Sequence, residues 1–320
     1  KLLHVKICDP AMGSGAFPMG LVNVISKLFI VLRTYSSINQ GRMKRYIMEQ
    51  NIYGVDIEPG AVDIARLRFW LAMVVDEVLK DGEKPTPLPN LHFKIMQGNS
   101  LLESYKGKDL SRLTEVNMGE VGTLGLESED AKSLIQDLRK FYNESHHDVR
   151  QRLLNGIINN VHRQIFELTQ NEEFIADVKD ISANDRFFLW HTWFVDVFEQ
   201  GGFDIVIGNP PYIQLQKSIG VMVKDKRGRD YELKLGDLYA HDGYEVFAKT
   251  GDIYCLFYEL GAKILKAGGH LCFITSDKWM RAGYGEKLRE FLANSTDPKI
   301  LIDFVGVQVF GSVTVDPNIM

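Results

Sequence analysis

Short runs of apolar residues alternate along this chain with longer stretches in which apolar positions recur every three or four residues. The runs predict buried strands at 2–7, 52–57, 91–96, 203–208, 270–275, 300–309 and within 313–320. The periodic stretches predict helices between them. Because strands that alternate with helices build parallel sheets, we expect an α/β fold with a doubly wound, mainly parallel sheet.

Three of these helices have a predicted buried face. The inward positions are Phe17, Leu21, Val24, Ile25 and Leu28 in the first, Ile64, Leu67, Leu71, Val75 and Val78 in the second, and Ile253, Leu256, Phe257, Leu260 and Ile264 in a helix over 252–266. Gly268 and Gly269 are expected to end that last helix.

The alternation stops between about 103 and 200, where the chain is mostly polar and 132–168 predicts one or two helices. We therefore interpret 1–102 as the cofactor-binding half of one domain, 103–200 as a mainly helical insertion, and 201–320 as the catalytic half. A basic, glycine-containing loop is expected over 217–234.

The composition, with 45% hydrophobic and 25% charged residues in 320, is that of a globular protein and excludes a disordered one. No apolar run reaches the roughly 20 residues that a bilayer requires. Cys8, Cys255 and Cys272 lie far apart in apolar surroundings, which indicates reduced thiols in the cytoplasm and no metal site. A net charge of -5 excludes a surface that is basic throughout but leaves room for a local basic face.

Unusual side chains follow three of the predicted strands. Gly13 and Gly15 follow the first, and their backbone allows a ligand to approach the start of the next helix closely. Asp56 ends the second strand, where a carboxylate accepts the hydroxyls of a ribose. Asn99 follows the third, where it is expected to hydrogen-bond an adenine amine. Since ligands bind at the carboxyl ends of parallel strands, the three together predict a pocket for an adenosine-containing molecule.

The identity of that molecule follows from what the glycine turn lacks. A dinucleotide fingerprint requires a third glycine where Pro18 stands, and the Gly-Lys-Ser/Thr of a phosphate loop is absent. Asp9 would repel a pyrophosphate but suits the positively charged amino-acid end of S-adenosylmethionine. A glycine pair alone is more often an ordinary turn. The three strand ends together favour S-adenosylmethionine.

Asn209, Pro210, Pro211 and Tyr212 directly follow the buried strand 203–208. Two prolines make a rigid extended turn, which can hold the Asn209 side-chain oxygen and the Pro210 carbonyl toward the two hydrogens of an –NH2 group. Tyr212 is then placed to stack on the ring that bears the amine. The other interpretation is a structural turn with a packed tyrosine. The strand context favours a catalytic site, in which two acceptors stabilise positive charge on the attacking nitrogen.

Four motifs resemble those of the gamma-class adenine-N6 DNA methyltransferases. They are Asp-Pro-Ala-Met-Gly-Ser-Gly-Ala-Phe at 9–17, Gly-Val-Asp-Ile-Glu-Pro at 54–59, Gly-Asn-Ser-Leu at 98–101 and Ile-Gly-Asn-Pro-Pro-Tyr at 207–212. With the insertion and Asp-Ile-Tyr at 252–254, the chain is most similar to the methylase regions of type IIG restriction–modification enzymes and of phage-exclusion (BREX) systems.

The resemblance implies a Rossmann-like S-adenosylmethionine-dependent methyltransferase fold and a flipped adenine in double-stranded DNA as the substrate. It implies cofactor contacts at Asp9, Pro10, Ala11, Gly13, Gly15, Asp56, Ile57, Asn99, Ser100 and Asn209, and a second base-stacking side chain at Phe310. The family also has a helical motif before the first strand and a target-recognition domain after the last. Neither is found in these 320 residues, so we expect an excised core whose target-recognition domain or subunit is missing.

Several cations follow the predicted strands 203–208 and 270–275 at the same edge of the sheet. We expect these cations to bind DNA phosphates. They are Lys217, Lys224, Lys226, Arg227, Arg229, Lys278 and Arg281. A solvated loop without a ligand is an equal alternative. Two other functions stay open: methylation of another planar amine, such as a protein glutamine or an RNA guanine, and a non-catalytic DNA-binding module.

Overall fold

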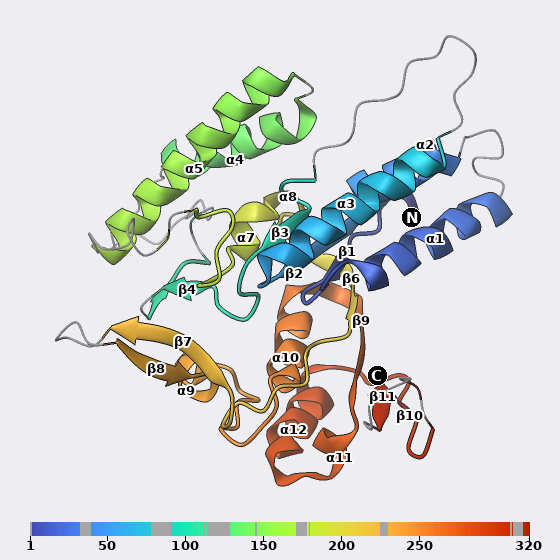
Figure 1. Cartoon of the computed structure of the whole chain (residues 1–320), viewed down its shortest axis with the longest axis vertical. Helices are drawn as coiled ribbons and strands as arrows, with labels where there is room; N and C mark the ends of the chain where they lie inside the picture. Colours follow the sequence, from blue (N-terminus) through green and yellow to red (C-terminus); the bar gives the residue numbers. More distant parts are fainter. Residues whose placement is uncertain are drawn as a thin grey trace.

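The structure is a computed structural model of the chain (Figure 1). The residues that it describes are 2–32, 40–77, 91–105, 107–111, 113, 129–144, 146–170, 178, 180–224, 230–307, 309 and 316–320. Within this part of the chain, no helix is long and apolar enough to cross a membrane.

A seven-stranded sheet forms the centre of the fold, in the order β10-β11-β9-β6-β1-β2-β3. Its parallel strands are β1 (Ile7–Asp9), β2 (Ile52–Asp56), β3 (Ile95–Gln97), β6 (Phe203–Gly208) and β9 (Leu265–Ser276). Two short strands, β11 (Pro317–Ile319) and β10 (Ile302–Asp303), run antiparallel at one edge. The expected α/β fold with a mainly parallel sheet is confirmed. β1 lies between β2 and β6, so the strand order reverses there, which is where such sheets bind ligands.

Alternating residues of these strands point into two separate cores. Cys8, Tyr53 and Met96 belong to one hydrophobic cluster, and their neighbours Ile7 and Ile52 to the other. On the second face the sheet is covered by α1 (Ala16–Val31), α2 (Gln40–Gln50) and α3 (Pro59–Val75), shown in blue to cyan in Figure 1. On the first face lie α7 (Trp190–Trp193), α8 (Val195–Phe198), α10 (Tyr254–Ile264) and α12 (Glu286–Ser295). Helices on both faces make the fold doubly wound.

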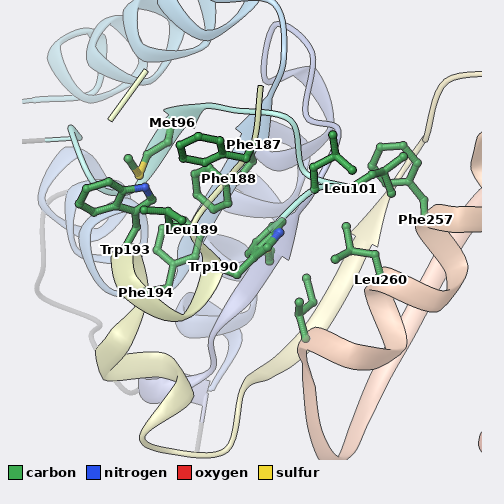
Figure 2. Close-up of a cluster of buried hydrophobic side chains, with 14 of the residues drawn as sticks. Met96, Leu101, Phe187, Phe188, Leu189, Trp190, Trp193, Phe194, Phe257 and Leu260 are labelled. Atoms are coloured by element: carbon green, nitrogen blue, oxygen red, sulfur yellow. The ribbon is translucent and has the colours of Figure 1, made fainter. Parts of the chain in front are cut away.

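Large aromatic side chains fill the first of these cores (Figure 2). Phe188 and Trp190 meet edge to face with centroids 4.8 Å apart, and Trp193 stacks on Phe93 at 5.3 Å. Each such side chain buries about 150–250 Å² and contributes more to the core than an aliphatic one. Phe188, Trp190 and Trp193 come from the end of the predicted insertion, so this part of it is integral to the sheet's packing.

The stretch between β3 and β6 also holds two long helices, α4 (Glu129–Asn143) and α5 (His147–Thr169), drawn as a green pair in Figure 1. They pack against each other and contribute Leu134 and Val161 to the first core. A separate two-stranded sheet is formed by β4 (Ser104–Tyr105) and β5 (Lys108–Asp109). The helices expected within 132–168 are thus two.

The basic segment after the catalytic turn is a hairpin, where the sequence predicted a loop. β7 (Ile219–Lys224) and β8 (Asp230–Lys234) pair antiparallel and lead into α9 (Leu235–Tyr239). The remaining elements are η1 (Leu2–His4), α11 (Lys278–Arg281) and η2 (Gly283–Gly285).

Several predicted strand and helix ends were wrong. Residues 2–4 form a turn of 3-10 helix because the Asn51 side chain donates to the Leu3 and Val5 carbonyls, and only Ile7–Asp9 pair in the sheet. α10 ends at Ile264 and the chain passes directly into β9, so Gly268 and Gly269 lie inside a strand. The strand predicted at 300–309 shrinks to β10, because the chain turns at Gly306 with φ of 75°.

The predicted inward faces of α1 and α3 were also mostly wrong. α1 buries Val22, Ile25 and Phe29, and α3 buries Val62, Ala65, Phe69 and Met73. Side chains expected inside are exposed instead: Phe17, Val24 and Leu28 on α1, and Ile64, Leu67, Leu71 and Val75 on α3. Both helices carry apolar residues on more than one side. Apolar periodicity alone was therefore compatible with two different buried faces for each helix.

Candidate active site

The turn after β1 depends on its two glycines. Gly13 and Gly15 have φ of 54° and 77°, a region that other residues rarely adopt. Gly15 also precedes α1, and a Cβ there would lie 2.9 Å from the Ala65 Cβ of α3. The turn therefore brings backbone N–H groups to the carboxyl end of β1, next to the start of α1.

Asp56 links this turn to β2. Its Oδ2 accepts a hydrogen bond from the Gly13 backbone nitrogen at 2.8 Å, and its Oδ1 accepts one from Glu58 at 3.0 Å. The half-buried carboxylate thus fixes the turn, and the second lone pair of each oxygen is the part that could accept a ribose hydroxyl. The neighbouring Ile57 side chain is 47% exposed at the same edge.

The loop after β3 closes on the same turn. The Ser100 hydroxyl donates to the Pro10 carbonyl at 2.6 Å, so this predicted cofactor residue holds the backbone of the turn. The Trp190 indole donates to the Ser100 carbonyl at 2.9 Å, a contact that sequence reasoning missed. Asn99 is buried, and its Oδ1 accepts hydrogen bonds from Leu101 N and from the Tyr239 hydroxyl.

Asp9 lies where the turn formed by Asn209 to Tyr212 comes close to the glycine turn after β1. β1 and β6 are parallel neighbours, and a Cβ on Gly208 would lie 2.5 Å from Asp9 Oδ1. The carboxyl is 2% exposed, and its Oδ1 accepts from Ala11 N at 3.1 Å. Burial raises its pKa to about 7, with Asp56 adding to the rise and the bond from Ala11 opposing it. A buried acid beside the turn favours a positively charged ligand.

Tyr212 and Asn209 touch each other. The Tyr212 hydroxyl donates to Asn209 Oδ1 at 2.9 Å and lies 3.3 Å from the Ile274 carbonyl oxygen of β9. The Tyr212 ring meets the Tyr254 ring edge to face, with centroids 5.8 Å apart. Asn209 is exposed at the sheet edge, whereas Pro210 is buried beneath it. Desolvation raises the pKa of Tyr212 to about 12, so its hydroxyl keeps its proton and can donate.

Asp252 anchors the other end of the catalytic turn. Its Oδ1 accepts from Ile213 N at 2.8 Å, and Leu215 N donates to the Gly251 carbonyl at 3.0 Å. The carboxylate also accepts backbone hydrogen bonds at the start of α10. The residues immediately after Tyr212 are thus tied to that helix. Sequence reasoning noted the Asp-Ile-Tyr motif but gave Asp252 no role.

A cavity of about 210 Å³ opens beside Tyr212. Ser276 of β9 lines it, so the cavity lies on the opposite side of β6 from β1 and Asp9. Its lining residues are Tyr212, Gln214, Thr250, Gly251, Asp252, Ser276, Lys278 and Tyr284. Tyr284 is held in place by a 2.8 Å hydrogen bond between its hydroxyl and that of Tyr254. The cavity therefore offers two aromatic rings, amide and carboxylate oxygens, and one cation.

The predicted phosphate-binding cations fall into three groups. Lys217 and Lys278 are exposed, and Lys278 lines the cavity. Arg281 is exposed but forms an ion pair with the buried carboxylate of Asp277. Lys224 ends β7, whereas Lys226, Arg227, Arg229 and the predicted stacking residue Phe310 lie outside the described residues.

The carboxyl edge of β1, β2, β3 and β6 thus gathers most of the predicted site from four segments. Asp9, Pro10, Ala11, Gly13, Gly15, Asp56, Ile57, Asn99 and Ser100 surround the glycine turn, and Asn209 to Tyr212 border it. The exposed cations Lys217 and Lys278 lie on the β6 and β9 side. Sequence reasoning missed Trp190, Tyr239 and Asp252.

Comparison with known proteins gives relatives of one kind. A protein of Methanocaldococcus jannaschii that bears the name "putative type II restriction enzyme and methyltransferase" is 27% identical over 99% of this chain and 29% of its own length. The type II restriction enzyme and methyltransferase RM.Eco57I of Escherichia coli is 24% identical over 98% of this chain and 24% of its own length. The chain therefore spans less than a third of either relative.

A similar fold is found among solved structures. A nuclease-deletion mutant of the Type ISP restriction-modification enzyme LlaGI, in complex with a DNA substrate mimic, has a TM-score of 0.50 and 13% identity, and covers 99% of this chain and 20% of its own. Residues 50–310 match the family of the Eco57I restriction-modification methylase. Since that match covers most of the described sheet and the whole catalytic turn, this chain belongs to the Eco57I restriction-modification methylase family.

Proposed function

We propose that this chain transfers a methyl group from S-adenosylmethionine to the exocyclic N6 amine of a flipped adenine in double-stranded DNA, within a restriction–modification or phage-defence system. The observation that carries the proposal is the close approach of Gly208 to Asp9. This approach brings the turn that carries the Asn209 side-chain oxygen and the Pro210 carbonyl, which can accept hydrogen bonds from an amine, next to the buried Asp9 carboxyl, which favours a cation. Membership of a restriction-modification methylase family supports DNA as the substrate.

The residues around the glycine turn fit S-adenosylmethionine. No cation among the described residues acts on the Asp9 carboxyl, and a buried acid without an ionic partner is stabilised by a positively charged ligand. Asp9 would hold the amino-acid end, Asp56 the ribose, and Asn99 with Ile57 the adenine. The cofactor supplies a methyl group that the sulfonium already activates, so the protein has chiefly to align donor and acceptor.

Asn209, Pro210 and Tyr212 would bind the target amine. The Asn209 side-chain oxygen and the Pro210 carbonyl accept its two hydrogens and favour positive charge on the nitrogen as the N–C bond forms. Tyr212 stacks on the base, and the adjoining cavity receives the extruded nucleotide. The Tyr212 hydroxyl donates to one lone pair of the Asn209 oxygen, and the second lone pair can accept a hydrogen bond from the amine.

Exposed lysines next to this cavity would contact DNA phosphates. Lys217 and Lys278 lie beside the catalytic turn, and we include Lys224, Lys226, Arg227, Arg229 and Arg281 in the same role. Such contacts position the duplex without reading its sequence. Because the relatives are more than three times as long, we propose that sequence recognition needs a further domain or subunit.

Tritiated methyl transfer from S-adenosylmethionine to DNA, RNA and protein fractions in parallel tests the function. We expect label in DNA alone, at N6 of adenine after digestion, and none with Asn209→Ala. Label in RNA or protein would identify another planar amine as the substrate. Absence of cofactor binding by calorimetry would leave only a non-catalytic DNA-binding module. A map of modified bases in the source genome, with and without the intact gene, gives the same answer for the whole protein.

A further inference from the structure

The loop that carries Asn99 is held from both halves of the domain. Asp56 and Pro10 receive hydrogen bonds from Gly98 and Ser100 on the cofactor side. From the catalytic half, the segment after α9 reaches across to it. The Tyr244 hydroxyl donates to the Leu101 carbonyl at 2.8 Å, and Asp242 accepts from the Ser104 hydroxyl at 2.5 Å. The position of the Asn99 backbone is therefore fixed.

The orientation of the Asn99 side-chain amide is fixed as well. Leu101 N and the Tyr239 hydroxyl both lie 3.3 Å from Asn99 Oδ1. A backbone N–H can only donate, so the amide atom that faces Leu101 is the oxygen, and the hydroxyl at the same atom donates too. Both lone pairs of that oxygen are then engaged inside the protein. The NH2 group is the end of the amide that is left to face a ligand.

Tyr239 is suited to this role by its burial. It is the last residue of α9, is 2% exposed, and reaches Asn99 across 140 positions of sequence. Desolvation raises its pKa to about 12, with the Asn99 bond opposing the rise, so the hydroxyl keeps its proton throughout the working pH range. Together with Leu101 N, which can only donate, this hydroxyl gives the Asn99 oxygen two donors and opposes rotation of the amide.

We propose that Tyr239 is a positioning residue that locks the Asn99 amide with its NH2 group toward the cofactor, so that Asn99 donates to the ring nitrogen beside the adenine amine. The inference rests on the proposed function, because it assumes that this pocket takes S-adenosylmethionine. It replaces the simpler expectation that the Asn99 oxygen accepts from the amine. The pocket then requires an unprotonated ring nitrogen in the base of the cofactor. It still binds a cofactor analogue whose base lacks the amine.

Calorimetry with S-adenosylhomocysteine tests this directly, because that product carries the same adenosine and no transferable methyl group. Two analogues separate the alternatives: one with the ring nitrogen beside the amine replaced by C–H, and one without the amine. We expect the first to bind about tenfold more weakly than the parent and the second within about threefold of it. The reverse order would overturn the proposal.

Tyr239→Phe removes the hydroxyl that donates to the Asn99 oxygen and keeps the aromatic ring. We expect the ratio of the two Kd values, C–H analogue over parent, to fall from about 10 toward about 3 or less, because the Asn99 oxygen then keeps only the Leu101 N donor and the flipped amide becomes more populated. Tyr244→Phe is the matched control, since it removes a buried hydroxyl that donates to the neighbouring Leu101 carbonyl. It should leave the ratio unchanged. Equal ratios in the two variants would show that Tyr239 is merely structural.

Asn99→Asp provides a positive control, because a carboxylate has no NH2 end and can only accept. In this variant we expect the desamino analogue to become the weaker ligand, and Tyr239→Phe to have no effect on the ratio. The two proposals fail separately. If wild type does not bind S-adenosylhomocysteine at all, the proposed function fails; if it binds with the reverse analogue order, only the role of Tyr239 fails.

Discussion

The Tyr212 hydroxyl donates a hydrogen bond to the Asn209 side-chain oxygen at 2.9 Å. These two side chains belong to the same four-residue turn, and we propose that both act on the target base. While the bond exists, one lone pair of the amine acceptor is occupied and the tyrosine ring is held against Tyr254. The turn is thus internally satisfied until a base arrives, which limits the penalty of leaving these polar groups without a ligand.

Substitutions of Tyr212 separate the ring from the hydroxyl. Tyr212→Phe keeps the stacking surface and frees Asn209, so we expect kcat for DNA methylation within about threefold of wild type. Tyr212→Ala removes the stacking, worth ~1–3 kcal/mol per base, and should lower kcat/KM by about 10- to 100-fold. Steady-state methylation kinetics distinguish them. Equal losses in both variants would show that the hydroxyl, and not the ring, is the functional group.

Asn209→Ala removes an acceptor that acts only as charge develops on the amine. We expect kcat to fall by about 10²- to 10³-fold, the loss found when a comparable transition-state hydrogen bond is removed. Binding of S-adenosylhomocysteine should weaken by no more than about threefold, because Asn209 is only one of the predicted cofactor contacts. A loss of cofactor binding as large as the loss of kcat would contradict a chiefly catalytic role for Asn209.

Asp9 makes cofactor binding depend on pH. Burial raises its pKa to about 7, so the carboxylate that attracts a positively charged ligand is present above pH 7 and is lost below it. The affinity for S-adenosylmethionine should therefore decrease on going from pH 8 to pH 6. Asp9→Asn should bind weakly and with a flat pH profile over this range. A pH profile in the variant equal to that of wild type would assign the dependence to another group.

The same carboxyl should destabilise the folded protein at high pH. Its folded pKa of about 7 lies above the ordinary 3.8, so the folded state binds more protons and stability falls as pH rises between these values. Asp9→Asn removes the buried charge but keeps an acceptor for Ala11 N. We expect its Tm to exceed that of wild type by several degrees at pH 8 and by much less at pH 5, measured by calorimetry without ligand. A constant difference would contradict the linkage.

Gly208 is required by the close approach of β6 to Asp9. In Gly208→Ala the new Cβ meets the Asp9 carboxyl at 2.5 Å, and we expect a loss of about 1–3 kcal/mol in unfolding free energy together with weaker cofactor binding. Gly20→Ala on α1 is the control, because nothing lies within 4 Å of its Cβ. That change should stabilise the helix by about 0.5–1 kcal/mol. Denaturant unfolding measures both.

Lys217→Gln with Lys278→Gln tests the phosphate contacts beside the cavity. Neutralising one phosphate-binding lysine should reduce the slope of log K for DNA against log salt by about 0.9, so we expect a reduction near 1.8 in the double variant. Lys299→Gln is the control, since Lys299 is exposed but pairs with Asp297 beyond α12. Neutralising Lys224, Lys226 and Arg227 together extends the test along the hairpin. An unchanged slope would favour a solvated face without a ligand.

The sequence predicted the ends of the central strands β2 and β6 better than it predicted the helix faces, for a physical reason. The buried strands of a parallel sheet are short apolar runs followed by polar chemistry, as at Asp56 and Asn209, and local composition defines where they stop. α1 and α3 are apolar on several sides, so their orientation is decided by close packing such as that of Gly15 against Ala65. No local pattern contains that information.

The site residues that sequence reasoning missed all act across long separations. Trp190 reaches Ser100 over 90 positions and Tyr239 reaches Asn99 over 140, through hydrogen bonds that depend on where the intervening segments fold. The motifs identified the side chains that are predicted to face a ligand. Trp190 and Tyr239 lie in no motif, because any residue with a donor at that point in space would serve.

The pairing of β1 with β6 has a consequence for biosynthesis. Lys6 and Asp204, which are joined by a hydrogen bond at the start of these strands, are 198 positions apart. At ribosomal speeds of about 5–20 residues per second, β1 waits roughly 10–40 seconds for its neighbour. During that time one edge of the strand is unpaired and Gly208 has not yet reached Asp9. Until residue 208 has left the ribosome, the segment that carries β1 is therefore exposed to misassociation and the proposed site is incomplete.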